Sequence, residues 1–421
     1  MGYQLQHLLD FSVILCTAGI VCCHRVRFDG FQVLRLTALN YQHEPFLIDL
    51  LRSEKFEFWD YPNDVMTSPE NKEELVQLLL ANDVLFYVLI EDIQQLIDAQ
   101  YHATSFAKPA ESKFDYSRYH TYYEIDRWIQ DTAAEYPQLT KVFSIGHSYE
   151  QRIMRVLKVG SSWQETKPAL WIQSGIHARE WISPATNIWM TNQLLKRYGN
   201  DQEITDLLDT FDFYILLITN PDGYEFTWTN NRLWRKTRSR NYNSTCYGTD
   251  ANRNWPYQWG GIGASPYPCS ETYRGQHPLS EIEVANVVDF ITKQGKIQDF
   301  VLIMDIHSYS QMWLNPWGHT KKHPDDYETH MDVGQLFVDA VFSSYGTEYR
   351  YGPISDLLYI ASGCTVDWGY GEMNILHSYS IELRDTGNYG FLLPKDQIIP
   401  TAVETFRGML AVWTYLKDNL L

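Results

Sequence analysis

Apolar and polar residues alternate at two spacings along the chain, and the first hundred residues switch repeatedly between them. A period of two is typical of half-buried strands, and a period of about 3.6 is typical of amphipathic helices. The pattern predicts strands at 31–36, 56–61 and 83–90, and helices at 46–51, 71–80 and from Ile93 onward. Short strands alternating with helices over residues 24–105 predict a small α/β domain of the open-sandwich type.

Beyond residue 105 the pattern breaks and then resumes over a longer stretch. Residues 102–113 lose all periodicity and gain Pro, Ser and Lys, which indicates a linker that we place at 106–113. Thr121 and Glu124 then have the spacing of a capping box that opens a helix. Over residues 114–421, strands are predicted at Ile153–Val159, Ala169–Ser174, 213–219, 300–306 and 378–383, and helices from Ser183, from Ser280, at 330–344 and at 400–417. This alternation predicts one large α/β domain with a mixed sheet.

The amino-terminal region contains an apolar run at residues 11–22. The run is too short to span a bilayer and suits the core of a signal peptide, which we place at residues 1–23. No Lys or Arg precedes it and Asp10 lies at its edge, so a buried amino-terminal strand is the alternative. No other segment of the sequence is long and apolar enough to cross a membrane. We therefore expect a secreted protein without a membrane partner.

Composition narrows the class of protein further. Of the 421 residues, 44% are hydrophobic and 20% are charged, which is typical of a globular chain able to bury a large core. The net charge of -18 argues against a nucleic-acid partner, because no basic stripe offsets repulsion by phosphates.

The cysteines agree with an oxidising compartment. Three of the six, Cys16, Cys22 and Cys23, lie in the predicted signal peptide. Cys246 and Cys269 are at a spacing that a loop disulfide could close, and Cys364 is left single. The pattern Asn243-Ser-Thr beside this pair is an acceptor for N-glycosylation, which is consistent with a surface loop of a secreted protein.

The segment His177-Ala-Arg-Glu180 carries the strongest chemical signal. It follows the predicted strand Ala169–Ser174, and Ser183 is the expected cap of the next helix, with Pro184 in its first turn. Open α/β sheets place their chemistry at the carboxyl ends of strands. One imidazole and one carboxylate there are two of the three protein ligands that a catalytic zinc requires.

Two further strands end in groups of the same kind. The strand at 300–306 leads directly into His307, which we expect to be the third, distant ligand. The strand at 378–383 carries Glu382 among apolar neighbours, where a buried carboxylate with a raised pKa could act as a general base. The alternative role for Glu382 is an ion pair with Arg384.

Two loop-like runs bring arginines into aromatic surroundings. They are Asn230-Asn-Arg-Leu-Trp-Arg-Lys236 and Asp250-Ala-Asn-Arg-Asn-Trp255. A solvated basic face is the alternative for the first run, whereas the polar residues of the second run are typical of a tight, ordered turn. The planar guanidinium of Arg is suited to binding a carboxylate.

Together with His307-Ser-Tyr-Ser-Gln and Glu382-Leu-Arg-Asp-Thr-Gly, these motifs give the chain a specific resemblance over residues 25–421. It resembles the secreted zinc metallocarboxypeptidases of the A/B subfamily, which are made as zymogens. The resemblance implies a mixed eight-stranded sheet flanked by helices at 114–421. It also implies a ferredoxin-like activation prodomain at 24–105 and an activation linker at 106–113.

Residue roles follow from the same resemblance, position by position. It implies one Zn²⁺ per chain, bound by His177, Glu180 and His307. Glu382 matches the general base, and Arg235 matches the cation that stabilises the oxyanion. Asp250 matches the acceptor that orients a zinc-binding histidine. The substrate-binding positions are Arg179, Asn252, Arg253, Tyr309, Tyr359, Val366 and Phe391.

Val366 occupies the position that is aliphatic in A-type enzymes and acidic in B-type enzymes, so we expect release of aliphatic or aromatic terminal residues. Cys364 departs from the family pattern, which has a glycine there and leaves more room in the pocket. At the usual activation position the linker offers Lys108 followed by Pro109, which is a poor site for an activating trypsin-like protease, and Lys113 is the substitute.

The resemblance further implies a digestive role, peptide and protein substrates with free carboxyl ends, and a monomer. The alternatives are a B-type or broad-specificity enzyme, a secreted peptide-binding homologue without catalysis, and an intracellular carboxypeptidase that processes acidic tails.

Overall fold

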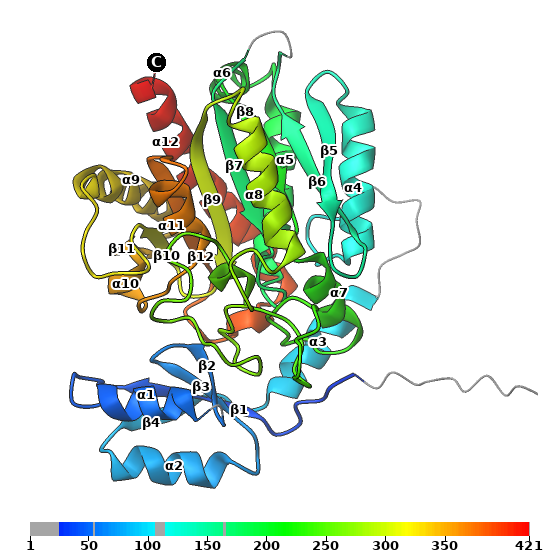
Figure 1. The fold of residues 1–421 in the computed structure, drawn as a ribbon. Coiled ribbons are helices and arrows are strands. Elements are labelled where there is room, and N and C mark those ends of the chain that lie inside the picture. The colour runs from blue at the N-terminus through cyan, green and yellow to red at the C-terminus, as the bar shows by residue number, and fades with distance from the viewer. Residues whose placement is uncertain (1–24, 54, 106–113, 163–165, 421) are drawn as a thin grey trace, which may run out of the picture.

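The computed structural model describes residues 25–53, 55–105, 114–162 and 166–420, which form a small domain lying below a large one (Figure 1). The predicted signal peptide at 1–23 and linker at 106–113 lie outside the described residues. Lys108, Lys113 and the first three cysteines therefore have no structural account.

The small domain is a four-stranded antiparallel sheet with two helices on one face. Its strands, in the spatial order β2-β3-β1-β4, are β1 (Gln32–Thr37), β2 (Glu57–Asp60), β3 (Asp64–Thr67) and β4 (Leu85–Ile90). The helices α1 (Glu44–Arg52) and α2 (Lys72–Ala81) pack on the sheet through a cluster that includes Leu34, Leu50 and Leu79. The element order βαββαβ is that of a ferredoxin-like fold and confirms the predicted open sandwich.

The prediction missed one strand of this sheet, β3. The strand is only four residues long and begins with Asp64, which is fully buried through a two-pronged ion pair with Arg35 on β1. A polar residue at the start of so short a strand conceals its burial pattern.

The helix α3 (Ile93–Ser105) leads from the small domain up to the large one (Figure 1). On it, Gln100 donates a hydrogen bond to the carbonyl of Leu393 (3.0 Å), and the Tyr101 hydroxyl donates to the carbonyl of Thr227 (2.7 Å). The connecting helix is thus bonded directly to the large domain.

The large domain is built on a mixed eight-stranded sheet, as the resemblance implied. Its order is β11-β10-β12-β9-β7-β8-β6-β5, with β12, β9, β7 and β8 parallel to one another. The strands are β5 (Thr140–His147), β6 (Ile153–Val159), β7 (Ala169–Ser174), β8 (Asp212–Leu216), β9 (Phe300–Ser308), β10 (Met312–Asn315), β11 (Arg350–Pro353) and β12 (His377–Leu383). Of these, β5, β10 and β11 were not predicted.

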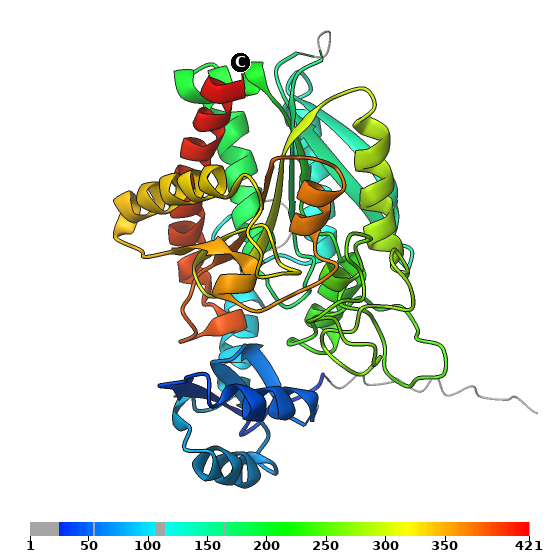
Figure 2. The same ribbon diagram turned by 60° about the vertical axis from the view of Figure 1, so that its left-hand side comes forward.

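Helices cover both faces of this sheet (Figures 1 and 2). On one face α12 packs against α5 and α9, and on the other α8 and α11 pack over a cluster that includes Trp171 and Trp368. The helices are α4 (Tyr122–Glu135), α5 (Ile182–Arg197), α6 (Gln202–Thr210), α7 (Pro221–Thr229), α8 (Ile282–Gln294), α9 (Tyr327–Tyr345), α10 (Ile354–Leu357), α11 (Thr365–Gly371) and α12 (Ile398–Leu420).

Helix starts give a mixed result. The capping box of Thr121 and Glu124 is present. The predicted caps at Ser183 and Ser280 are wrong, because α5 begins after Trp181 and α8 begins after Glu281.

A different partner explains each of the two wrong caps. The backbone N–H of Ser183 already bonds to the carbonyl of Glu180, so this serine lies inside the helical turn. At α8, the Asn254 side chain accepts from the N–H of Glu281, and the Ser280 hydroxyl donates to the Glu281 carboxylate instead of capping the helix.

The described cysteines lie in the large domain. The predicted disulfide between Cys246 and Cys269 is present, and Cys364 is free and buried.

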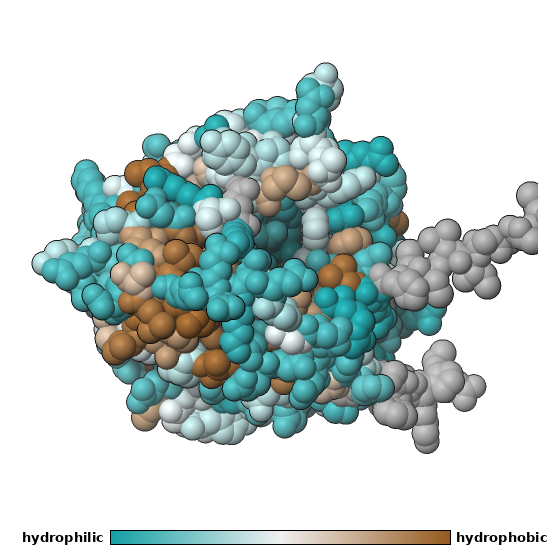
Figure 3. All heavy atoms as spheres, turned by 90° about the horizontal axis from the view of Figure 1, so that it is seen from below, coloured by the Kyte–Doolittle hydropathy of each residue, from teal (hydrophilic) through white to brown (hydrophobic). Residues whose placement is uncertain are grey.

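Seen from below, apolar side chains gather over the small domain and a hollow opens beside it (Figure 3). Among the described residues, no helix has both the length and the apolar character needed to cross a bilayer.

Candidate active site

Three neighbouring parallel strands deliver the main candidate residues to one edge of the large sheet. His177 follows the carboxyl end of β7, His307 lies near the end of β9, and Glu382 lies near the end of β12. Since β9 lies between β7 and β12, the three segments end side by side. Glu382 is directly opposite His307 in the pairing of β12 with β9.

The loop between β7 and α5 is already coiled like the start of a helix. The N–H of Glu180 bonds to the carbonyl of His177 (3.3 Å), and the N–H of Ser183 bonds to the carbonyl of Glu180 (3.1 Å). Such a turn places side chains three residues apart on the same side. The loop conformation therefore aims His177 and Glu180 at one point.

His177, Glu180 and His307 form a buried group that could hold a metal ion, with ligand atoms all within 4.8 Å of one another. The Nδ1 atom of His177 lies 2.8 Å from Oε1 of Glu180 and 3.2 Å from Nδ1 of His307. The His307 Nδ1 atom lies 3.1 Å from Oε2 of Glu180. Two imidazole nitrogens and one carboxylate make up the His₂Glu set of a catalytic zinc site, with one position left for water or substrate.

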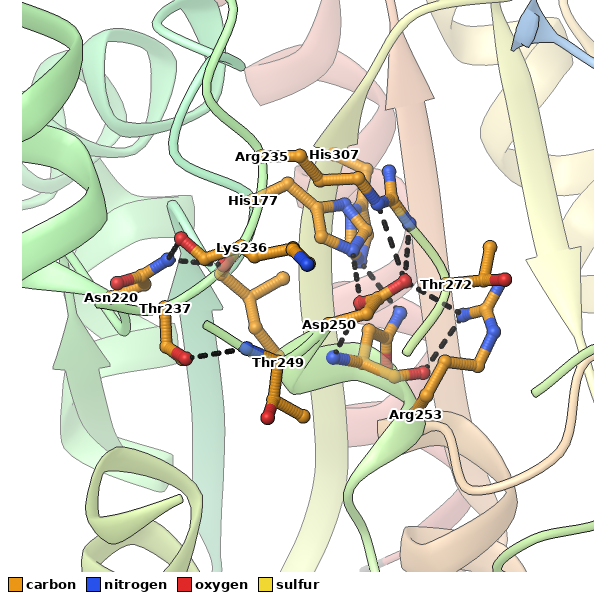
Figure 4. Close-up of polar contacts among 12 residues, drawn as sticks. His177, Asn220, Arg235, Lys236, Thr237, Thr249, Asp250, Arg253, Thr272 and His307 are labelled. Carbon is orange, nitrogen blue, oxygen red and sulfur yellow. Dashed lines mark hydrogen bonds and ion pairs between the residues drawn. The ribbon is translucent and has the colours of Figure 1, made fainter. Parts of the chain in front are cut away.

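Carboxylates behind the two histidines hold the rings in place. The Nε2 atom of His177 lies 3.1 Å from Asp250, and the Nε2 atom of His307 lies 3.1 Å from Asp305. A carboxylate at Nε2 favours the tautomer with its proton there, which leaves the Nδ1 lone pairs directed at the shared centre. The residues present thus fit a zinc ion, and Figure 4 shows both rings above Asp250.

The sequence interpretation missed Asp305. Its carboxylate also accepts a hydrogen bond from the hydroxyl of Thr365 (2.8 Å), so it is fixed on two sides. The signal was present, because residues two apart on a strand share a face and Asp305 is the polar residue two before His307. The contacts with His307 and Thr365 explain why an aspartate lies inside an otherwise apolar strand.

Glu382 is partly buried beside the metal group, and no hydrogen bond or ion pair engages its carboxylate within the described part of the chain. Loss of hydration raises the pKa of Glu382 well above its usual value, and the carboxylates of Glu180 and Asp60 add to the rise. The imidazole of His307 and the guanidinium of Arg235 oppose this rise.

The alternative role for Glu382, an ion pair with Arg384, is wrong. Arg384 lies one residue beyond the end of β12 and pairs with Glu404 on α12. The Glu382 carboxylate therefore remains available to a ligand in the cleft.

Asp250 links the metal group to two arginines. Its Oδ2 atom accepts from Nη2 of Arg235 (2.9 Å) and lies 3.8 Å from Nη1 of Arg253, as the dashed lines in Figure 4 show. Because these cations face a fully buried carboxylate, the pKa of Asp250 lies well below its usual value despite burial. Arg235 also lies 4.0 Å from Glu180, at the rim of the metal group.

A second cluster gathers around Arg253. The Nη2 atom of Arg253 donates to the hydroxyl of Tyr359 (3.0 Å), and Asn252 lies 3.4 Å from Nε2 of His307 through its side-chain nitrogen. The Asn252 oxygen accepts from the backbone N–H of Thr365 (3.0 Å), which fixes the amide. The structure thus brings Asn252, Arg253 and Tyr359 together beside the metal group.

Val366 lies in an apolar cluster next to Asn252 and Thr365. The buried members of this cluster are Met312, Leu314, Ile354, Cys364 and Val366. The adjacent acid, Asp367, is turned away and accepts from the backbone N–H groups of Gly318 and His319 (2.8 Å each). Its Oδ2 atom also lies 2.8 Å from Nδ1 of His319, so the carboxylate is committed to these partners.

The outer candidates contact the small domain. Arg179 forms an ion pair with Glu57 on β2, and the Tyr309 hydroxyl donates to Asp64 on β3 (2.8 Å). The ring of Phe391 lies 5.2 Å from that of Trp59, measured between centroids. Sequence interpretation did not predict Glu57, Trp59 or Asp64, because their role depends on how two domains meet.

Comparison with known proteins agrees with this arrangement. Residues 125–408 match the family described as zinc carboxypeptidase, and residues 34–100 match the carboxypeptidase activation peptide. The chain belongs to the zinc carboxypeptidase family. It is thus a metallocarboxypeptidase that carries an activation peptide, and the His177, Glu180 and His307 group is its candidate zinc site.

Individual relatives match over nearly the whole chain. Carboxypeptidase A1 of Bos taurus is 41% identical over 427 residues, which cover 99% of this chain and all of that protein. The crystal structure of thrombin activatable fibrinolysis inhibitor has a TM-score of 0.84 at 34% identity, covering 93% of this chain and 100% of that one. The crystal structure of carboxypeptidase A from Helicoverpa armigera has a TM-score of 0.86 at 25% identity, covering 94% and 99%. The small domain of this zinc carboxypeptidase is called the prodomain below.

Proposed function

We propose that this metallocarboxypeptidase releases aliphatic and aromatic residues from the free carboxyl ends of peptides. The observation that carries this proposal is the apolar cluster around Val366, in which the neighbouring carboxylate of Asp367 is already occupied. A Lys or Arg side chain entering such a pocket would lose its hydration without gaining a partner. An aliphatic or aromatic side chain gains by the same burial.

In this proposal the terminal carboxylate of the substrate binds Arg253, with Asn252 and Tyr359 as further donors. The 3.0 Å contact between Arg253 and Tyr359 and the fixed Asn252 amide support this assignment. The guanidinium presents a planar pair of donors that matches a carboxylate. An internal peptide bond offers no such negative charge, which restricts cleavage to the chain end.

The chemical step then falls to Glu382 and Arg235. Zinc, when bound, lowers the pKa of a water molecule and polarises the substrate carbonyl. Glu382, raised in pKa and without a partner among the described residues, accepts the proton of the attacking water and passes it to the leaving amine. Arg235, oriented by Asp250, donates to the oxygen on which negative charge develops.

The prodomain contacts favour inhibition by occupation of the outer cleft. Glu57, Asp64 and Trp59 engage Arg179, Tyr309 and Phe391, which are the positions that would bind the upstream part of a peptide. We propose a secreted, monomeric digestive zymogen with a signal peptide at 1–23 and a prodomain at 24–105. A trypsin-like protease would cut its linker at Lys113, because Pro109 disfavours cleavage after Lys108, and would free the catalytic domain at 114–421.

The test is the release profile of terminal residues after limited trypsin treatment. Peptides that differ only in a final Phe, Leu, Lys or Arg would be offered to the activated protein, and the freed amino acids quantified. Release of Phe and Leu well ahead of Lys and Arg is expected. Release of Lys faster than Phe or Leu would contradict the proposed specificity.

A further inference from the structure

The loop between two active-site residues, Arg235 and Asp250, carries a chemical pattern that hydrolysis does not use. The chain leaves the site at Arg235, returns at Asp250, and is tied to a second loop by the Cys246–Cys269 disulfide. Near the tip of the loop lies Asn243-Ser-Thr, the single Asn-x-Ser/Thr pattern in the 421 residues. We propose that Asn243 is a glycosylation site that carries an N-linked oligosaccharide.

The geometry of the loop presents this asparagine to solvent. Asn243 and Thr245 are both exposed with the prodomain in place. Asn243 has a φ of 56°, a left-handed conformation that Asn adopts more readily than most residues. Within the described part of the chain, no hydrogen bond or ion pair engages the Asn243 amide, which leaves its nitrogen accessible.

The base of the loop is fixed, so the tip remains outside. Buried Asn241 donates to the carbonyls of Cys246 (3.1 Å) and Gly248 (3.0 Å). The hydroxyl of Ser244 accepts from the N–H of Cys246 (3.1 Å). Neighbouring polar side chains are therefore committed to loop structure, and Asn243 is the one amide at the tip with no such role in the described structure.

An exposed aromatic residue at the tip is a second observation that points to a sugar. Tyr242, immediately before Asn243, is 81% exposed. The C–H face of a pyranose ring stacks on aromatic rings, so the first sugar on Asn243 would cover apolar surface that otherwise contacts water.

The modification is a group transfer in the lumen of the secretory pathway, so it rests on the proposed secretion. A bond forms between Nδ2 of Asn243 and the anomeric carbon of the oligosaccharide. The bond from that carbon to a phosphate oxygen of a lipid pyrophosphate donor breaks. The lipid pyrophosphate leaves with the electron pair, and the amide gives up one proton.

The experiment directs the full chain into the secretory pathway of eukaryotic cells with a heterologous signal placed before Met1. Secreted protein is treated with peptide-N-glycosidase in water labelled with heavy oxygen. A faster-migrating band, and heavy oxygen at position 243 by mass spectrometry, are expected. Because N243Q and T245A remove the acceptor pattern, both should migrate at the deglycosylated position without further change.

Two conservative variants separate the acceptor pattern from loop folding. T245S keeps the hydroxyl of the acceptor pattern, and S244A removes a hydrogen bond of the loop while leaving the acceptor pattern intact, so both should retain the shift. Secreted wild-type protein that the enzyme does not alter, or a shift that persists in N243Q, would overturn the proposal. In a parallel sample without the added signal, failure of residues 1–23 to direct secretion would contradict the proposed secretion, while a glycan at Asn243 would still be detectable in protein that carries the added signal.

Discussion

The metal group and the outer cleft differ in which domain they contact. His177, Glu180 and His307 come from the large domain, and their supporting carboxylates, Asp250 and Asp305, come from it too. The outer cleft, in contrast, meets the prodomain at Arg179, Tyr309 and Phe391. The metal group is therefore complete with the prodomain in place, and under the proposed function the prodomain acts on access to it.

This difference predicts that the largest loss of activity comes from within the large domain. Glu382→Gln keeps the shape of the side chain and removes the proposed base, so hydrolysis should fall by about 10²–10⁴-fold. The measurement is kcat/KM on a blocked dipeptide ending in Phe after trypsin treatment, with zinc content determined in parallel. Zinc content should stay at one ion per chain.

The matched control is E328Q, at an exposed carboxylate on α9. If the E382Q enzyme were as active as the E328Q enzyme, Glu382 would have no part in hydrolysis.

The second-largest effect is expected from the carboxylates that orient the zinc-binding histidines. Asp305→Asn weakens the acceptor at Nε2 of His307 and should reduce zinc affinity by roughly 10–100-fold. Competition with a chromophoric chelator measures this affinity. Thr365→Val removes the other hydrogen bond of the same carboxylate and should leave zinc affinity almost unchanged. Equal losses in both variants would instead indicate a general packing defect.

The contacts between the outer cleft and the prodomain predict how fast the cleaved prodomain dissociates. Asp64→Asn removes the charge that pairs with Arg35 and accepts from Tyr309. Of these two contacts, the hydrogen bond from Tyr309 crosses the domain interface, and a hydrogen bond to a charged group contributes about 2 kcal/mol, which is roughly 30-fold in dissociation. After trypsin cleavage, size-exclusion chromatography should show the severed prodomain leaving faster than in wild type.

D83N, at an exposed prodomain turn, is the control for this variant. Identical release from D64N and D83N would show that the Asp64 contacts do not hold the prodomain.

The apolar pocket should give the smallest effect. A Cβ built on Gly318 would lie 3.2 Å from Sγ of Cys364, so this thiol fills space against the backbone opposite. Cys364→Gly should enlarge the pocket and raise the preference for terminal Phe over Leu by about tenfold. Ratios of kcat/KM for the two peptides measure it. C364S preserves the volume and should keep the wild-type ratio; a C364G ratio equal to that of C364S would place the thiol outside the pocket.

The elements that sequence predicted well are those with an undisturbed pattern. β7 (Ala169–Ser174) was predicted at its observed limits because all six of its residues are buried. β10 and β11 are only four residues long, and β5 mixes exposed and partly buried positions without regular alternation. Tertiary contacts set these strands, and a local pattern does not carry that information.

The candidate site divides in the same way. Local spacing identified His177 and Glu180, and strand ends identified His307 and Glu382. Side chains whose role depends on a distant partner were missed, including Asp305 behind His307 and Glu57 against Arg179. The fate of Arg384 also depended on α12, since Glu404 lies on that helix.

The pairing of Glu382 with His307 across β12 and β9 also sets where the chain can change in length. Successive residues of a strand point to opposite faces, so one residue inserted between His377 and Glu382 would turn the carboxylate to the far side of the sheet. The same insertion in the turn between α11 and β12 would lengthen the turn and leave the pairing of β12 with β9 unchanged. Length variation is therefore expected to be compatible with activity in the turn at 372–376, and incompatible with it over the six residues that follow.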